Sequence, residues 1–454
     1  MASKVKKGFL YYLLWFVFIV FGIACIFATI LFFNPGKDVF GIGLKYISNS
    51  NSIKENQVLI NSQKVYIEDL EISDINVSAG FSTVKVVEQN TYDRISILID
   101  GKISGFAKKG EKATLSYSIT YNDSVLNIAI TEPQTWLSFS KSSIVTICCP
   151  LRSTFFSNIN FNIQTKSGDV NIGTSREYDL LTLNSVNVKT ESGDVNFLSN
   201  VGFASGEATI EAQKSITVDC NITKMLTVKT NSAKLKVGDI TGGLTIDSNE
   251  LSAKCATIGG DVIYSSAKGF ITINKVCGNF SASTDEEKTH IANVTILEAL
   301  KDVTIPEGKA STIKLVKVLG NIKLDTTTGD ITINECGGNV DISTTKGSVK
   351  LMQTSPNSTV IVSTQSGDIV ANYLEACNTT ITSETGDINI NIASGKSYIV
   401  KYSTQKSISI DWITTELAKQ GEQKSPDYAE AHATINATTE KDIAITSNFV
   451  KEED

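Results

Sequence analysis

A short turn motif recurs along much of this 454-residue chain, and it limits the folds that the chain can adopt. The motif reads Thr or Ser, any residue, Ser or Thr, then Gly-Asp and a branched aliphatic residue. Its clearest copies carry the pairs Gly168-Asp169, Gly193-Asp194, Gly329-Asp330, Gly367-Asp368 and Gly386-Asp387. With Gly347 from a weaker copy, the motif glycines from Gly329 to Gly386 lie 18, 20 and 19 residues apart. Such a constant period indicates stacked repeats.

The chemistry of the motif predicts a tight corner between two strands. Glycine supplies the positive φ angle that a corner needs, and the polar side chains can bond the turn amides. Alternating apolar residues flank the corners, as in Val340-Asp341-Ile342 and Val349-Lys350-Leu351, so every second side chain points inward. Stacking such units at ~4.8 Å buries these side chains. We therefore expect an all-β fold, a parallel β-solenoid (β-helix) of roughly 13–15 coils over residues 155–447. An antiparallel meander or sandwich could use the same turns without needing so regular a period.

The N-terminal segment predicts a single transmembrane helix. Residues 8–33 form an uncharged run that would span ~39 Å as a helix, against ~30 Å of bilayer hydrocarbon. Lys4, Lys6 and Lys7 precede the run, so residues 1–7 should be a cytoplasmic tail and the rest extracytoplasmic. The expected location is the cell membrane.

Two other processing routes compete with this anchor. A cleaved signal peptide normally has a shorter apolar region that ends at small residues, whereas this run ends at Ile30-Leu31-Phe32-Phe33. A lipoprotein signal at Gly22-Ile23-Ala24-Cys25 would place glycine where a branched aliphatic residue is usual. The sequence favours an uncleaved helix.

The remaining segments are assigned by their composition. Residues 34–64 are rich in Ser, Asn, Gly and Lys and predict a stalk, and residues 65–154 predict a strand-rich N-terminal part of the ectodomain. Residues 412–431 interrupt the repeats as an insertion or cap, with a helix expected at Glu416–Gln420. Residues 448–454 form an acidic tail.

The segment Ile144-Val145-Thr146-Ile147-Cys148-Cys149-Pro150, followed by the Gly-Asp repeats and preceded by an anchor, resembles the bacterial putative-adhesin family. That family is a domain of unknown function found in envelope proteins, and its fold is a β-solenoid. The resemblance covers about residues 65–447 and implies surface attachment. It brings no established catalytic residues. The many cysteines, the long N-terminal strands and the degenerate turn Thr439-Glu440-Lys441-Asp442 depart from the usual pattern.

The recurring aspartates raise the question of a calcium site. Stacked carboxylates could bind calcium, but the calcium-binding β-roll pattern has paired glycines and a nine-residue period that this repeat lacks. We therefore expect turn residues, and no metal, cofactor or catalytic site. Outside the anchor, seven cysteines give an odd count that cannot pair completely, and we expect them to fill inner corners as buried thiols: Cys148, Cys149, Cys220, Cys255, Cys277, Cys336 and Cys377.

Charge and aromatic content limit the partners. A formal charge of -7 argues against nucleic acid and against docking on anionic lipid. The two histidines, His290 and His432, lie too far apart in sequence for a local zinc motif. Trp136 and Trp412 are isolated rather than arranged as a platform for sugar rings.

Together these features predict a membrane-anchored, extracytoplasmic β-solenoid that is not an enzyme. Its expected role is adhesion, scaffolding or the binding of a protein or glycan partner on the cell surface. Two alternatives remain open at this point: an accessory subunit of a membrane complex, as in envelope-stress sensing, and a polysaccharide-active β-helix enzyme. The enzyme would require converging carboxylates in a pocket.

Overall fold

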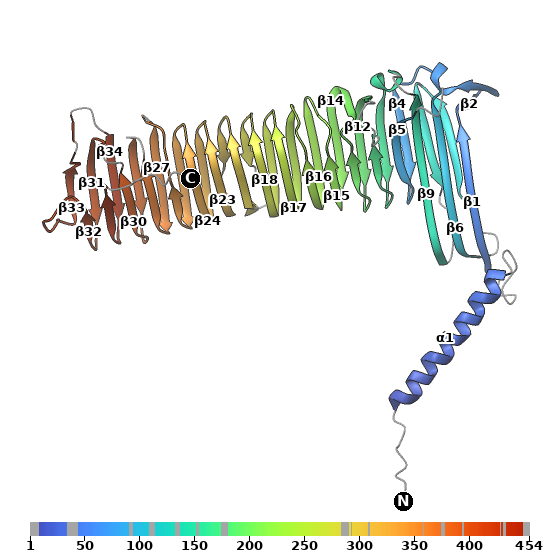
Figure 1. Ribbon diagram of the computed structural model, residues 1–454, viewed down its shortest axis with the longest axis horizontal. Coiled ribbons are helices and arrows are strands. Elements are labelled where there is room, and N and C mark those ends of the chain that lie inside the picture. Colours follow the sequence, from blue (N-terminus) through green and yellow to red (C-terminus); the bar gives the residue numbers. More distant parts are fainter. Residues whose placement is uncertain are drawn as a thin grey trace, which may run out of the picture.

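The computed structural model describes residues 9–33, 44–89, 94–108, 114–131, 137–150, 154–173, 180–282, 290–291, 293–306, 309–356, 358–373, 377–392, 395–426, 428–429 and 433–447. The predicted tails at 1–7 and 448–454, and also Trp136 and His432, lie outside these ranges. One helix and a long β rod make up the described chain (Figure 1).

Helix α1 (Phe9–Phe33) stands apart from the rod and projects to one side of it below β1 (Figure 1). Its side chains are described for residues 14–26. Seven consecutive apolar residues, from Leu14 to Val20, are 49–66% exposed. Over the described residues, no helix is both long enough and apolar enough to cross a membrane.

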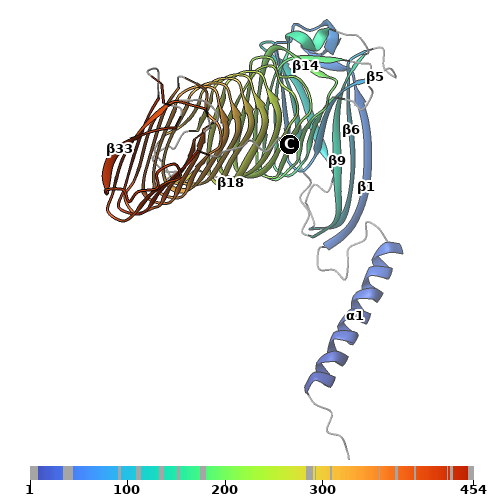
Figure 2. The same cartoon turned by 60° about the vertical axis from the view of Figure 1, so that its left-hand side comes forward.

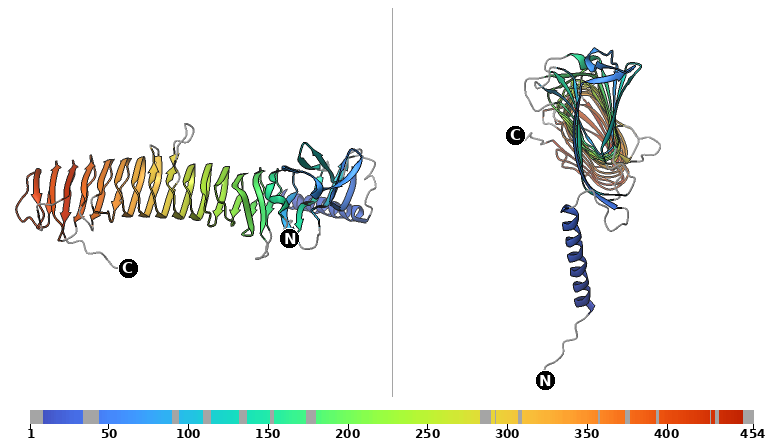
Figure 3. Two further views of the ribbon diagram at one scale, coloured as in Figure 1. Left: turned by 90° about the horizontal axis from the view of Figure 1, so that it is seen from above. Right: turned by 90° about the vertical axis from the view of Figure 1, so that its right-hand side faces the viewer.

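The rod is built from stacked coils, each of which gives one strand to each of two opposite faces (Figures 1 and 2). We call the strands before the Gly-Asp corners face A and the strands after them face B. Four long strands, β16 (Met225–Val237), β17 (Gly243–Ile258), β18 (Val262–Val276) and β24 (Ile322–Cys336), run through the corner and belong to both faces. Neighbouring strands along each face pair in parallel, as the period predicts (Figure 3).

The other strands divide between the faces as follows, in spatial order from the α1 end. Face A holds β8 (Val125–Thr131), β4 (Asp74–Ala79), β10 (Asn160–Thr165), β12 (Leu181–Thr190), β14 (Val201–Ala212), β19 (Phe280–Ala282), β22 (Val303–Ile305), β25 (Val340–Lys346), β27 (Thr359–Ser366), β29 (Asn378–Ser383), β34 (Ala433–Thr439) and β31 (Tyr398–Thr404). Face B holds β9 (Leu137–Pro150), β5 (Thr83–Gln89), β11 (Val170–Ile172), β13 (Val195–Phe197), β15 (Ser215–Val218), β21 (Asn293–Ala299), β23 (Lys309–Val318), β26 (Val349–Leu351), β28 (Ile369–Tyr373), β30 (Ile388–Ile392), β35 (Ile443–Thr446) and β32 (Ile408–Ile410). The short β20 (His290–Ile291) pairs with the start of β23.

The core is one continuous apolar column inside the rod. Alternate residues of each strand point inward, and in-register pairing stacks like on like: Val77 lies beside Ile163, which lies beside Val188. All three are at most 2% exposed. Branched aliphatic residues predominate because they suit the pleated, closely spaced strands.

The two ends depart from the predicted parallel arrangement. At the α1 end, β6 (Ser96–Lys108) runs antiparallel to β9, β1 (Leu44–Glu55) runs antiparallel to β6, and β7 (Ser116–Asn122) runs antiparallel to β8. At the far end, β33 (Gln420–Lys424) runs antiparallel to β31. The parallel solenoid was expected over residues 155–447, so β1, β6 and β7 lie before that range, and β33 lies within the insertion expected at 412–431. Antiparallel strands cover coil edges that would otherwise template assembly.

The terminal coils are also out of sequence order. The coil β4/β5 lies between β8/β9 and β10/β11, so an earlier segment is enclosed by two later ones. At the far end the coil β34/β35 lies between β29/β30 and β31/β32. Each end of the rod thus contains one intercalated coil.

Two expectations were wrong. The predicted stalk contains β1, the hairpin strand β2 (Gln57–Ile60) and the start of its partner β3 (Gln63–Tyr66), because β6 supplies a pairing edge for a polar strand. The helix expected at Glu416–Gln420 is absent from this described stretch, where Trp412 and Leu417 pack against the core and Trp412 Nε1 donates to the Lys424 carbonyl at 3.0 Å. Two short 3-10 turns, Ile67–Asp69 and Phe155–Asn158, complete the fold.

Candidate binding surface

The predicted corner glycines stack directly on one another along one edge of the rod. A Cβ atom added to Gly386 would lie 1.9 Å from the carbonyl oxygen of Gly367, and one added to Gly193 would lie 2.0 Å from that of Gly168. For Gly168 the nearest carbonyl is that of Ser82, at 1.8 Å. Gly329 also has a φ of 106°. Only glycine lets successive corners approach this closely.

The predicted corner aspartates bond from coil to coil. The backbone N–H of Asp194 donates to Asp169 Oδ1 at 2.8 Å, and that of Asp387 donates to Asp368 Oδ1 at 2.9 Å. In the same way the Ser348 N–H donates to Asp330 Oδ1 at 2.9 Å. These contacts are those of turn residues. Among the described residues, no group of three or more His, Cys, Asp or Glu side chains is placed to hold a metal ion.

The described cysteines form no disulfide bonds, and six of the seven outside α1 are buried. The reason is the register of the coils: the neighbours of Cys255 in adjacent coils are Val237 and Ile273, so no second thiol faces it. Burial raises the pKa of Cys148, Cys220 and Cys255 to about 12. These thiols therefore serve as small apolar side chains.

The buried thiols predict a loss of stability at alkaline pH. Their folded pKa of about 12 exceeds the ordinary value of 9.0, so the folded chain retains protons that the unfolded chain releases. The free energy of unfolding should be unaffected by these thiols below pH 9. Between pH 9 and 12 it should fall by about 1.4 kcal/mol per pH unit for each thiol. Chemical denaturation of the full chain at several pH values measures this, and a Cys220→Ala, Cys255→Val variant should show a shallower decrease. An unchanged slope in that variant would contradict the argument.

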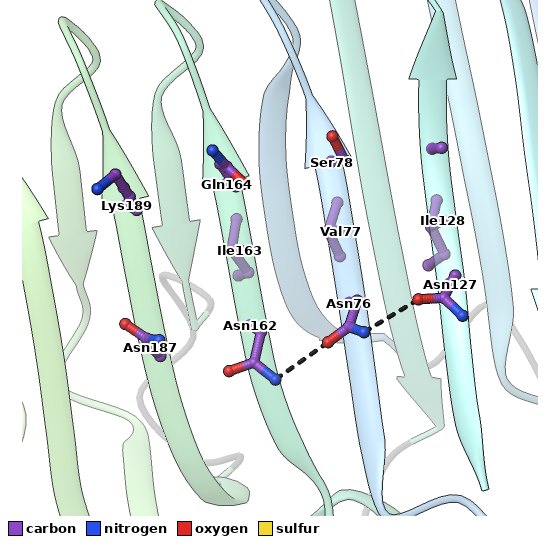
Figure 4. Close-up of a pocket in the computed structure, with 11 residues that line it drawn as sticks. Asn76, Val77, Ser78, Asn127, Ile128, Asn162, Ile163, Gln164, Asn187 and Lys189 are labelled. Atoms are coloured by element: carbon purple, nitrogen blue, oxygen red, sulfur yellow. Dashed lines mark hydrogen bonds between the residues drawn. The ribbon is translucent and has the colours of Figure 1, made fainter. Parts of the chain in front are cut away.

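A hollow of about 430 Å³ lies on the outer side of face A, over β8, β4, β10 and β12 (Figure 4). Two columns of outward side chains line it, and we call it the asparagine hollow. In-register pairing builds the first column from Asn127, Asn76, Asn162 and Asn187. The second column consists of Ala129, Ser78, Gln164 and Lys189. The buried residues between the columns, such as Val77 and Ile163, fix the positions of both.

The asparagines of the first column are partly joined in a ladder (Figure 4). Asn76 Nδ2 donates to Asn127 Oδ1 at 2.9 Å, and Asn162 Nδ2 donates to Asn76 Oδ1 at 3.0 Å. A carboxamide has two N–H donors and two acceptor lone pairs, so each ladder member keeps hydrogen-bonding capacity beyond the ladder. The ladder holds the side chains in fixed positions without using up that capacity. It is suited to binding a polar ligand without a large loss of side-chain entropy.

The charge of the asparagine hollow is close to neutral. Its lining includes one charged residue, Lys189, whose Nζ lies 2.8 Å from Glu211 Oε1 in the next coil. Among the described residues that line the hollow, none carries a carboxylate. A second hollow, of about 450 Å³, lies over β1, β6 and β9, and Asp100 supplies the one carboxylate of its described lining. Neither hollow therefore supplies the pair of carboxyl groups that glycoside hydrolysis requires.

Sequence reasoning missed the asparagine hollow. Asn76 begins one of many glycosylation sequons, and such sequons are expected by chance in a chain rich in Asn, Ser and Thr. Asn127 and Asn162 lie 51 and 86 residues from Asn76 along the chain, far from the period of about 20. The one indication of the hollow in the sequence was an asparagine at the third position of several strands with alternating apolar residues. Its register could not be read because β4 is intercalated.

Part of the rod matches a known protein family. Residues 268–446 match the Toastrack DUF4097 family, which confirms the resemblance to bacterial adhesin-type domains of unknown function. No curated protein matches the chain. The match covers the distal part of the rod and leaves the asparagine hollow outside it.

Three solved structures align with most of the chain at low sequence identity. A "putative cell adhesion protein" from Clostridium sporogenes shares 8% identity over 88% of this chain and 100% of its own, with a TM-score of 0.16. A "putative adhesin" from Bacteroides fragilis shares 11% identity over 88% of this chain and 97% of its own, with a TM-score of 0.15. A "putative lipid binding protein" from Parabacteroides distasonis shares 13% identity over 76% and 96%, with a TM-score of 0.20. Likeness at such low scores carries no argument about function.

Proposed function

We propose that this protein is a membrane-anchored rod that acts outside the membrane in adhesion or scaffolding, by binding rather than by catalysis. The observation that carries the proposal is the asparagine hollow, a fixed array of outward hydrogen-bonding groups on a rigid face. Ligand sites of this kind need preorganised polar groups, and the ladder supplies them. Residues 268–446 match the Toastrack DUF4097 family, and the resemblance of the sequence to the bacterial putative-adhesin family supports the same role.

The anchor is the second part of the proposal, and two observations support it. The run at residues 8–33 has no charge and follows three lysines, which favours a cytoplasmic N-terminus. The apolar side chains from Leu14 to Val20 are exposed on every side of α1, since seven residues of a helix cover its whole circumference. Exposure of that much apolar surface to water is unfavourable by about 25 cal/mol per Å², so an apolar phase should cover it.

Cysteine labelling tests the anchor and its orientation. We expect Ser50→Cys, on exposed β1, to react with a membrane-impermeant maleimide on intact cells in a Cys277→Ser background. Lys6→Cys in the same background should react only after lysis, because the tail is proposed to be cytoplasmic. Both variants should remain in the membrane after alkaline carbonate washing. Release by carbonate, or labelling of Lys6→Cys on intact cells, would refute the proposed anchor.

Binding to cells tests the role. The full chain in lipid nanodiscs should bind intact bacterial cells, and an Asn76→Ala, Asn162→Ala variant should bind at least fivefold more weakly in a fluorescence assay. The matched control is Asn196→Ala, which removes an asparagine of an equivalent ladder with Asn171 on face B. Equal binding by the three proteins would refute the asparagine hollow as the binding surface. Absence of binding together with co-purification of a defined membrane protein would favour an accessory subunit instead.

A further inference from the structure

We propose that the asparagine hollow binds an unbranched, uncharged polysaccharide of β-1,4-linked sugars that lies along the rod axis with one sugar per coil. This inference rests on the proposed function and specifies its ligand. It follows from the period of the site, from the groups that face outward and from their charge.

The period of the site is set by the backbone. Members of the asparagine column come from adjacent paired strands, so they repeat at ~4.8 Å along the rod axis. An extended β-1,4-linked pyranose chain advances per sugar by a length close to this strand spacing, and its successive rings are turned over by half a turn. An extended peptide advances by ~3.3 Å per residue and would lose register after a single coil. The spacing therefore favours a glycan over a peptide.

The outward groups match adjacent sugar hydroxyls. Asn76 uses one N–H and one lone pair within the ladder, so one donor and one acceptor remain for a ligand. A pair of neighbouring hydroxyls on a pyranose ring likewise offers one acceptor and one donor. In the second column, Ser78 and Gln164 add a hydroxyl and a carboxamide beside the same coils. Each coil can thus face one ring, and every second ring presents its pair of neighbouring hydroxyls to the asparagine column.

Charge and length further restrict the ligand. The ion pair of Lys189 with Glu211 neutralises the one charged residue of the described lining, so a polyanionic glycan gains little there. The asparagine column spans the four coils of β8, β4, β10 and β12, and continues as Thr209 in the next coil. Four consecutive sugars therefore fill the site.

Calorimetric titration of the full chain in nanodiscs with cello-oligosaccharides of two to six glucose units tests the inference. Affinity should rise with each sugar up to four and then stay constant. For the tetramer, Asn162→Ala should raise the Kd at least tenfold, whereas Asn196→Ala on the opposite face should leave it unchanged. Maltohexaose, whose α-linked chain curves away from the axis, should not bind.

Several results would overturn the ligand assignment. One is an affinity that still rises from four to six sugars, and another is a Kd that Asn162→Ala does not change. A third is tighter binding of maltohexaose, or of an extended hexapeptide, than of the cello-oligosaccharides. If no oligosaccharide binds while cell binding still depends on Asn162, the glycan assignment fails and the proposed function stands. If cell binding is also independent of Asn162, both fail.

Discussion

Gly386→Ala is expected to lower the stability of the rod by about 3 kcal/mol or more, because the new methyl group meets backbone rather than a flexible side chain. The added Cβ would lie 1.9 Å from the Gly367 carbonyl oxygen, and real Cβ atoms stay beyond 3.0 Å. The corner at Gly386 must then move away from the corner at Gly367, and this movement weakens the pairing of β28 with β30. Hydrogen exchange of the full chain measures this locally, and protection should fall first in β29 and β30.

Alanine substitution of two other glycines distinguishes the effect of the steric clash from the effect of losing the backbone conformational freedom of glycine. Gly395 has a φ of 74°, but its added Cβ would meet nothing within 4 Å, so Gly395→Ala should cost only about 1 kcal/mol. Gly202 has neither feature, since its nearest contact would be Leu180 Cδ1 at 3.6 Å, and Gly202→Ala should change stability by less than about 0.5 kcal/mol. If Gly386→Ala were no worse than Gly395→Ala, close stacking of the corners would not be the reason for glycine.

Truncation after residue 426 is expected to abolish the ordered structure of the distal end of the rod. It removes β34 and β35, which pair with β29 and β30 on one side and with β31 and β32 on the other. The strands on both sides of the gap then lose the hydrogen-bonded neighbour that the missing coil supplied, and β31 keeps only its antiparallel pairing with β33. Hydrogen exchange in β31 and β32 should become as fast as in an unfolded chain, and the exposed edge should promote aggregation in size-exclusion chromatography.

The strands on the two sides of the gap should not pair directly with each other. The reason is that the missing coil places small residues beside large side chains of β31. In the complete rod the buried Tyr398 lies beside Ala433, and Tyr402 lies beside Ala437. If β31 shifted onto β29, Tyr402 would lie beside Ile381 instead, since Ile381 is the other neighbour of Ala437. Such overpacking costs about 1–3 kcal/mol.

A truncation after residue 447 is the matched control for this experiment. It removes only the acidic tail at 448–454 and leaves every described strand intact, so protection throughout the distal coils should be unchanged. Persistent protection of β31 and β32 in the shorter chain would show that these strands restack in sequence order.

The corners and the core could be predicted from the sequence because both depend on local chemistry. Gly329 and Asp330 recur with their neighbours at a fixed period, and the alternating Val340 and Ile342 mark the inner side of a strand. The coil of residues 74–89 could not be placed, since its spatial neighbours begin 51 and 86 residues later in sequence. The asparagine hollow depends on that placement, so it was missed for the same reason. The antiparallel caps were missed because the residue pattern of a strand does not encode the direction of its partner.

The two intercalated coils also determine when the rod can be completed during synthesis. A solenoid in strict sequence order could wind progressively as the chain emerges from the ribosome. Here the coil at residues 74–89 lacks one neighbour until β8 and β9 have appeared, and the position between β29/β30 and β31/β32 is filled only by residues 433–446. Winding is therefore not vectorial at either end. A prematurely terminated chain has unpaired strand edges at this position. Quality-control proteases could use these edges to distinguish it from the full-length protein.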